Sequence, residues 1–362
     1  MEQDPRLPRD AMLAGIESRA AQADRHDGDL SRDIAALRSA GWLVACLPRD
    51  HGGKGWGSEP SGTIAAFEAL RALGRANLSV ARLFEGHMNG VKLIALYADE
   101  PARAKAYQAM RDGALMGVWG ADAPGQAVAV SDAGLTGAKR FASGLGLVTH
   151  ALITVADKDG VQLALVEVTD AARSEPSSWR MSGMRATRSG LYNLEGVDCD
   201  DVAWVSQPGE YFTEPFFEGG IWRYCAAHLG AAEALFAVFR DTLVAQGRQD
   251  DPHQRDRLAR TAMALETMRL WLERAAAEIE AHGAPPHKAA LALFARDVTE
   301  RQCRTLIAEV EAGLGMAAHA EGTPVERIRR DLALFLCQAV PDAKRQRAVE
   351  TLLEQGGRIE QL

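Results

Sequence analysis

The chain lacks several features that would assign it to a specialised class of protein. Its 362 residues include five cysteines, which are scattered and form no CxxC pair, so neither a disulfide framework nor a zinc site is indicated. No apolar run approaches the roughly 18 residues that a membrane span needs. The net charge of −8 argues against general binding to nucleic acid and to anionic membrane surfaces.

The chain also lacks the beginning that is typical of a secreted protein. Its first residues, Met1–Pro5, are too charged for a signal peptide. The overall composition is ordinary for a soluble globular protein, with 47% hydrophobic and 25% charged residues. A chain of this length is expected to form two or three domains with a large core. We therefore expect a cytoplasmic protein with no membrane and no nucleic-acid partner.

The first region of the chain, up to about residue 113, has the pattern of helices. Residues 29–39 have one apolar face, and Gly41 ends that pattern. Further helices are predicted at 60–73 and 78–97. The glycine-rich loop 52–57 has neither a GK[ST] ending nor a preceding strand, so we interpret it as a connection between helices and not as a phosphate loop.

Short β-rich runs follow, between about residues 117 and 205. They are separated by Gly, Asp, Ser and Pro, which favour turns. This spacing predicts a small antiparallel sandwich or barrel. The runs lie at 115–119, 127–130, 151–155 and 162–168.

Helices return from about Glu218, and three long Ala-rich helices are predicted at 224–244, 255–282 and 286–314. Ala-rich helices pack closely and suit a bundle. The predicted fold is therefore α+β, and mainly α. Its three domains are an N-terminal helical domain (1–113), a middle β domain (114–207) and a C-terminal helical bundle (208–362).

Five segments, found in the same order along the chain, resemble signature segments of the acyl-CoA dehydrogenase superfamily. Together they identify the chain as a divergent member and imply that superfamily's three-domain fold. The segments are DIAALRSAGW (33–42), the strand and loop at 115–125, LTGAKRFASG (135–144), GMRAT (183–187) and the ending that starts with Arg330-Asp331.

In that superfamily FAD binds with its isoalloxazine ring between the β domain and the bundle, so the resemblance implies FAD here. Trp119 and Asp122 would lie along the edge of the flavin. Phe141 would pack on the ring, and Ser143 would bond near N5 or O4. Asp122 replaces a Thr of the superfamily, and near N1 a carboxylate would disfavour the anionic reduced flavin. The alternative is that all four are ordinary strand residues.

The resemblance implies that three other residues contact the adenosine half of FAD. Arg248 and Gln254 stand where the superfamily has an Arg and a Gln that reach the FAD of a partner subunit. Gly313 belongs to a run that resembles glycines beside the pyrophosphate, where glycine permits close approach of the backbone. The loop around Arg248 is shortened, so a solvated helix connection is the alternative. A shared cofactor implies a homodimer or homotetramer.

The catalytic base of the acyl-CoA dehydrogenases is missing from its usual positions. Its Glu follows the Arg-Asp pair where Ala339 stands here, and alanine cannot accept a proton. In some members the Glu precedes an Arg on a bundle helix, but here Trp222 precedes Arg223. Trp222 also fills space where an acyl chain could pass. We therefore take Trp222 and Arg223 as substrate-binding candidates for a small or unusual substrate.

Two other residues are candidate bases. Glu218 lies four residues before Trp222, and a carboxylate in a dry pocket beside a flavin would have a raised pKa. The alternative is an acid at a helix start, favoured by the helix dipole. His87 lies in a polar cluster with Glu85 and Asn89, on a helix that borders the substrate cavity in the superfamily, and histidine titrates near neutrality. The alternative is a buried, hydrogen-bonded histidine.

Three functions compete, and none requires a metal. The favoured function is an FAD-dependent oxidoreductase that acts on an atypical acyl thioester and uses a relocated base. Its partner would be an electron-transfer flavoprotein. The second is a monooxygenase of the same fold, which takes reduced flavin from a flavin reductase and needs no Glu. Such enzymes commonly carry a His where Gln338 stands here. The third is a non-catalytic flavoprotein that stabilises a complex.

Overall fold

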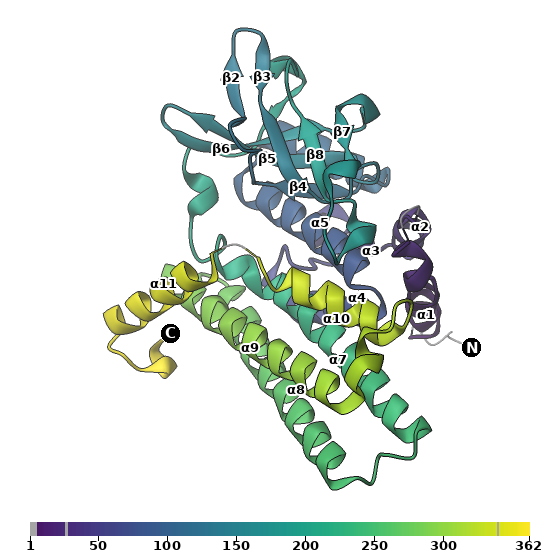
Figure 1. The fold of residues 1–362 in the computed structure, drawn as a ribbon. Helices are drawn as coiled ribbons and strands as arrows, with labels where there is room; N and C mark the ends of the chain where they lie inside the picture. The colour runs from purple at the N-terminus through teal and green to yellow at the C-terminus, as the bar shows by residue number, and fades with distance from the viewer. Residues whose placement is uncertain (1–5, 26–27, 339) are drawn as a thin grey trace, which may run out of the picture.

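The computed structural model describes residues 6–25, 28–338 and 340–362, and it shows three regions that follow one another along the chain (Figure 1). Helices form the first region, strands form the second, and helices form the third. The predicted class, α+β and mainly helical, is confirmed. No helix in the described ranges is both long and apolar enough to cross a membrane.

The helices of the first region begin at caps that the sequence supplies. Asn77 accepts a hydrogen bond from the backbone N–H of Ser79 at the start of α5, and Asp99 accepts one from Ala102 at the start of α6. These bonds satisfy donors that the first helical turn leaves unpaired. The helices are α1 (Arg6–Ala23), α2 (Ser31–Ser39), α3 (Trp42–Ala45), α4 (Thr63–Ala76), α5 (Leu78–Tyr97) and α6 (Glu100–Arg111).

Two sheets form the middle region. The larger sheet has six strands in the order β3-β2-β5-β6-β9, with β1 also paired to β5, and the smaller sheet has the order β4-β8-β7. The strands are β1 (Met116–Trp119), β2 (Ala129–Ser131), β3 (Gly134–Thr136), β4 (Ala138–Ala142), β5 (His150–Asp157), β6 (Gly160–Glu167), β7 (Ser174–Glu175), β8 (Gly190–Asn193) and β9 (Ala203–Trp204).

The larger sheet is mixed, whereas the sequence predicted an antiparallel one. β5 and β6 form an antiparallel hairpin along their full length. β1, however, runs parallel to β5, with Met116 opposite His150, and β2 also meets β5 in parallel at Ala129 and Ala156. The reason is that residues 120–149 separate β1 from β5, which is long enough for a crossover that returns the chain in the same direction.

In the described part of the third region, residues 208–338 and 340–362, the α-helices are α7 to α11. Asp251 caps α8 by accepting hydrogen bonds from the backbone N–H groups of His253 and Gln254. The helices are α7 (Trp222–Ala245), α8 (Pro252–Ile279), α9 (Ala289–Leu314), α10 (Pro324–Phe335) and α11 (Pro341–Glu354).

The first and third regions pack on each other through glycine. α4 crosses α7 at Gly74 and Gly230. A Cβ atom at Gly230 would lie 1.9 Å from the carbonyl oxygen of Arg71, and one at Gly74 would lie 2.1 Å from that of Ala227. Only glycine allows two helix backbones to approach this closely. α5 contacts both β1 and α7, so it forms one wall of the space where the three regions meet.

Candidate functional site

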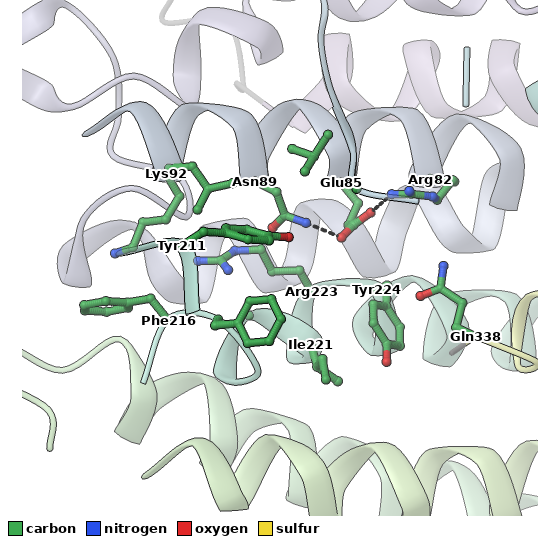
Figure 2. Close-up of a pocket in the computed structure, with 15 residues that line it drawn as sticks. Arg82, Glu85, Asn89, Lys92, Tyr211, Phe216, Ile221, Arg223, Tyr224 and Gln338 are labelled. Atoms are coloured by element: carbon green, nitrogen blue, oxygen red, sulfur yellow. Dashed lines mark hydrogen bonds and ion pairs between the residues drawn. The ribbon is translucent and has the colours of Figure 1, made fainter. Parts of the chain in front are cut away.

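A cavity of about 230 Å³ lies where the three regions meet (Figure 2). α5 and the end of β1 form one side of it, and the segment 211–221 with the first turn of α7 forms another. Gln338, just beyond α10, lies at one end. The charged and amide side chains that line the cavity are Arg82, Glu85, Asn89, Lys92, Arg223 and Gln338.

A buried ionic network lies behind one wall of this cavity. Glu280, which follows α8, accepts hydrogen bonds from Lys92 (3.0 Å), from Arg223 and from the indole N–H of Trp222 (3.1 Å). Burial raises the pKa of the Glu280 carboxyl, but Arg223 and Lys92 lower it by more, so the net effect holds this pKa below its ordinary value. Two cations against one anion leave the network with a net charge of +1.

The two residues that were predicted to bind substrate both donate to Glu280, but they differ in their access to the cavity. Arg223 lines the cavity, and its guanidinium also donates to the carbonyl oxygen of Gly57 at 3.0 Å. Trp222 is fully buried behind it and packs against Phe67, with ring centroids 6.4 Å apart. Arg223 is therefore available to a bound molecule, whereas Trp222 supports the wall.

One acidic side chain faces the cavity among the lining residues that the structure describes. This residue is Glu85, and Figure 2 shows that both of its carboxylate oxygens are engaged. Arg82 donates to one oxygen and Asn89 to the other. The three residues stand three and four positions apart on α5, so they share one face of the helix. No free carboxylate is thereby presented to a molecule in the cavity.

Aromatic side chains cover the cavity from the segment that precedes α7. Tyr211, Phe212 and Phe217 pack against one another, with ring centroids 5.0–5.2 Å apart. The ammonium of Lys92 lies 4.5 Å from the centroid of the Phe216 ring, a cation–π contact. Burial raises the pKa of Tyr211 to about 12, so its phenol keeps its proton at neutral pH and can donate a hydrogen bond.

Both residues predicted as bases are engaged away from the cavity. His87 is fully buried, its Nε2 lies 3.0 Å from the carbonyl oxygen of Leu43, and its Nδ1 accepts the backbone N–H of Met116 at 3.1 Å. Burial lowers the pKa of His87 to about 4, so the ring is neutral and Nε2 donates to Leu43. Glu218 forms an ion pair with Arg347 of α11. The geometry favours the structural alternatives: a hydrogen-bonded histidine and an ion-paired acid.

Two of the predicted flavin contacts are held within the β domain. The ring of Trp119 is buried, its indole N–H donates to the carbonyl oxygen of Ser143 at 3.2 Å, and it packs on Tyr192 with ring centroids 5.4 Å apart. Asp122 forms an ion pair with Lys139, whose side chain is fully buried. Trp119 thus supports the turn after β4 that carries Ser143, and Asp122 neutralises a buried cation that would be costly without a partner.

Of the other two, Phe141 lies on the surface of the β domain, whereas Ser143 is buried. Phe141 is 46% exposed, has a φ of +54°, and its ring centroid lies 6.1 Å from that of Trp179. The Ser143 hydroxyl ends a chain of hydroxyl groups, with Ser189 at 2.8 Å and Thr187 a further 2.7 Å away. A positive φ at a bulky residue is strained, and such strain clusters at functional sites. The exposed Phe141 ring suits the stacking of a flat ring.

The three residues that were assigned to the adenosine half of FAD lie in different surroundings. Arg248 is exposed and donates to the side chain of Gln246 at 3.1 Å. Gln254 is buried, and its Oε1 has no hydrogen-bond partner among the described residues. A Cβ atom at Gly313 would lie 2.5 Å from the ring of Phe239 and 3.0 Å from Oε1 of Gln254. Within this chain Gly313 therefore serves the packing of α9 on α7, and contact with a cofactor stays a prediction.

The position of the superfamily's usual base, Ala339, lies outside the described residues. The residue before it, Gln338, lines the cavity, and its carbonyl oxygen accepts a hydrogen bond from Arg296 at 3.1 Å. The ending that follows the Arg-Asp pair therefore borders the cavity.

Sequence reasoning missed three functional candidates at the cavity: Lys92, Tyr211 and Glu280. Glu280 stands 188 positions from Lys92, so no local spacing could pair them. Lys92 was detectable as a charge in an apolar stretch of helix. Glu85 and Asn89 were noticed for that reason, as polar residues beside His87.

The C-terminal region matches a family model described as acyl-CoA dehydrogenase, C-terminal domain, over residues 223–337. The third region therefore carries a domain similar to the C-terminal domain of acyl-CoA dehydrogenases. The matched range begins at Arg223 of the cavity and includes the Arg-Asp pair of α10. The superfamily assignment made from the signature segments is confirmed.

Similar proteins of the superfamily share the fold at low sequence identity. Dibenzothiophene monooxygenase of Rhodococcus erythropolis is 25% identical over 211 residues, which cover 53% of this chain and 49% of that protein. The chain thus spans about half the length of the curated relatives it matches. FMN-bound TdsC from Paenibacillus sp. A11-2 has a TM-score of 0.79 at 18% identity, covering 95% of this chain and 96% of that one. Methanesulfinate monooxygenase MsuC from Pseudomonas fluorescens has a TM-score of 0.80 at 20% identity, covering 98% of both chains.

Proposed function

We propose that this chain is a flavin-dependent monooxygenase and not an acyl-CoA dehydrogenase. The observation that carries the proposal is that Glu85, the one acidic residue on the described lining of the cavity, is already held by Arg82 and Asn89. A dehydrogenase needs a carboxylate placed to take a proton from a substrate carbon. The similarity to two proteins named as monooxygenases supports the same reaction class.

The cofactor we propose is a flavin, and the surface around Phe141 and Ser143 supports it. The exposed Phe141 ring offers a stacking face, and the Ser143 hydroxyl, two residues further along the chain, is held in place by Ser189. A bound flavin, supplied in reduced form by a separate reductase, would provide two electrons to molecular oxygen. One oxygen atom would then enter the product, and the other would leave as water. TdsC is described as binding FMN, whereas the signature segments led us to expect FAD.

The side chains of the cavity indicate a small substrate with an acidic or electron-rich group. The network of Lys92, Arg223 and Glu280 has a net charge of +1, which favours a negative group at its cavity side. Tyr211 can donate a further hydrogen bond. The rings of the segment 211–217 exclude water, which strengthens these interactions.

The test compares the two reaction classes on one protein preparation. Protein saturated anaerobically with reduced FMN or FAD is mixed with oxygen, and flavin absorbance and hydrogen peroxide release are followed. We expect the protein to change the rate of flavin oxidation and to suppress peroxide release when a substrate is present. Straight-chain acyl-CoA should leave the absorbance of oxidised flavin unchanged.

The variant Glu85→Gln sharpens this comparison because Gln keeps the size and hydrogen-bonding capacity of the side chain. A monooxygenase should retain its reaction with oxygen in this variant. A dehydrogenase that uses Glu85 as its base should lose about 10²–10⁴ in rate. Bleaching of the flavin by acyl-CoA in the wild type, abolished by Glu85→Gln, would contradict the proposal.

A further inference from the structure

A second cavity is lined by four arginines and, within the described chain, by no acidic side chain. It has a volume of about 790 Å³ and lies between the segment 176–188 of the β domain and the two residues Arg25 and Gly28. In a chain whose net charge is −8, four cations around one cavity reverse the sign of the field locally. The arginines are Arg25, Arg180, Arg185 and Arg188, and the ring of Trp179 lines the same space.

Carboxylates of the described residues offset these arginines only in part. Hydrogen bonds from Ser31, together with the charge of Arg188, hold the pKa of Asp29 below its ordinary value. Arg185 lies 3.9 Å from Asp24, but that carboxylate is already bound by Arg330. Among the described residues no carboxylate lies within 4.0 Å of the other three guanidinium groups. The four exposed arginines still leave an excess of positive charge at this concave surface, which would attract an anion.

The backbone that carries two of the arginines is strained and firmly held. Met184 has a φ of +54° and Arg188 a φ of +45°, on either side of the turn Arg185–Thr187. The backbone N–H of Met184 donates to Asp331 at 2.7 Å, and the Thr187 hydroxyl donates to the carbonyl oxygen of Met184 at 2.7 Å. A left-handed conformation at bulky residues persists only where such bonds enforce it. The backbone positions that carry Arg185 and Arg188 are therefore fixed.

The same turn connects this cavity to the surface proposed for the flavin. The indole N–H of Trp179 donates to the carbonyl oxygen of Met184 at 3.1 Å, and its ring meets Phe141 edge to face. Thr187 and Ser189 link the turn to the Ser143 hydroxyl. A ligand that stacks on Phe141 would thus have the arginines within the same continuous surface.

We propose that this cavity binds the phosphate group of a nucleotide-like ligand through Arg180, Arg185 and Arg188. Guanidinium groups bind phosphate oxygens with paired hydrogen bonds, and the Trp179 ring offers a face for a base or flavin ring. The inference rests on the proposed function in one respect, because the phosphate could be the flavin's own. The other source is a separate nucleotide or phosphorylated compound that shares this chemistry.

The experiment compares two variants that remove the same number of charges. The site variant carries Arg180→Gln, Arg185→Gln and Arg188→Gln. The control carries Arg240→Gln, Arg255→Gln and Arg301→Gln, three exposed arginines that pair with acidic neighbours outside the cavity. Calorimetric titration gives the dissociation constants for FMN, FAD, riboflavin and inorganic pyrophosphate, and thermal unfolding checks the fold of each protein.

Each source of the phosphate predicts a different pattern. If the flavin carries it, the site variant should bind FMN at least about tenfold more weakly than the control, while riboflavin, which has no phosphate, binds equally to both. If a separate ligand carries it, FMN affinity should stay level and pyrophosphate affinity should fall at least about tenfold. Equal affinities of site variant and control for FMN, FAD and pyrophosphate would overturn the proposal.

Two further comparisons keep the outcome decisive. If the site variant fails to fold, the single change Arg180→Gln, which lies outside the strained turn, should still weaken phosphate binding relative to Arg255→Gln. If the wild type binds pyrophosphate in an arginine-dependent way but binds no flavin in either redox state, the proposed function fails while this site stands.

Discussion

At the scale of single residues, Glu280 is the anion that allows two cations to be buried. It holds Arg223 and Lys92, which come from different regions of the chain. We predict that Glu280→Gln lowers the free energy of unfolding by about 3–5 kcal/mol, because it leaves two buried charges without a counter-ion. Urea denaturation followed by circular dichroism gives this value.

The matched control for Glu280 is Glu266→Gln, which breaks a solvent-exposed pair with Arg269. That change should cost far less than Glu280→Gln, because solvent screens an exposed ion pair. Equal losses in the two variants would mean that the buried network contributes no more than a surface pair.

Glu214 gives the protein a pH dependence of stability. Burial raises its pKa to about 7, against an unfolded value near 4.5. The folded chain therefore binds this proton more tightly than the unfolded chain, so the contribution is complete below pH 4.5 and is lost as the pH rises to about 7. In the wild type, this group should lower the free energy of unfolding by up to about 3 kcal/mol as the pH rises, and we predict that Glu214→Gln removes this loss.

Melting temperatures between pH 4.5 and 8 test this prediction for Glu214. The melting temperature of the wild type should fall more steeply over that range than that of Glu214→Gln. Glu354 is exposed, so the melting temperature of Glu354→Gln should follow that of the wild type. A steeper fall in Glu214→Gln than in the wild type would reverse the sign and contradict the prediction.

At the scale of elements, α11 is attached to the site region through Glu218. Arg347 donates to both oxygens of this carboxylate. We predict that Glu218→Gln accelerates amide hydrogen exchange in α11, because it removes a bidentate charge-assisted pair. The rate at which bound flavin reacts with oxygen should change by less than about twofold, since a general base would be worth 10²–10⁴.

The control for α11 is Asp342→Asn, which breaks a pair with Arg345 inside the helix and leaves Glu218 in place. Exchange in α11 should then change less than in Glu218→Gln. If Glu218→Gln instead abolished turnover and left the exchange of α11 unchanged, Glu218 would be the base that the sequence suggested.

Long helices could be predicted from the sequence. The direction of the strands could not, nor could the residues that pair with the side chains of the site. Residues 78–97 were assigned to a helix with the same bounds that α5 has, because twenty residues of apolar periodicity outweigh local ambiguity. The parallel pairing of β1 with β5 depends on a crossover that no short motif records. Arg223 was found by its motif, but its partner Glu280 lies 57 positions away, on another helix end.

At the scale of the whole molecule, the homodimer or homotetramer remains a prediction, as does the cytoplasmic location. Met263 and Leu270 on α8 are 62% and 54% exposed, and their seven-residue spacing places them on one face of the helix. We predict an oligomer by light scattering at micromolar concentration. Met263→Glu with Leu270→Glu should weaken it, because charges would then be buried in the contact.

The control for that contact is Leu353→Glu, which changes an equally exposed apolar residue on α11. Its oligomeric state should match that of the wild type. A wild-type monomer at the same concentration would contradict both the predicted assembly and the role of α8 in it.

The bond between Asp331 and the Met184 backbone has a consequence for the order in which the protein matures. Arg330 also reaches back to Asp24, 306 positions earlier, and to the carbonyl oxygen of Ser182. During synthesis the β domain leaves the ribosome long before these two residues exist, and domains begin to fold as they emerge. The strained turn at 184–188 then has no partner to hold it until nearly the whole chain has been translated. Nascent chains that stop before α10 should therefore display a folded β domain in which the backbone of this turn is not yet fixed.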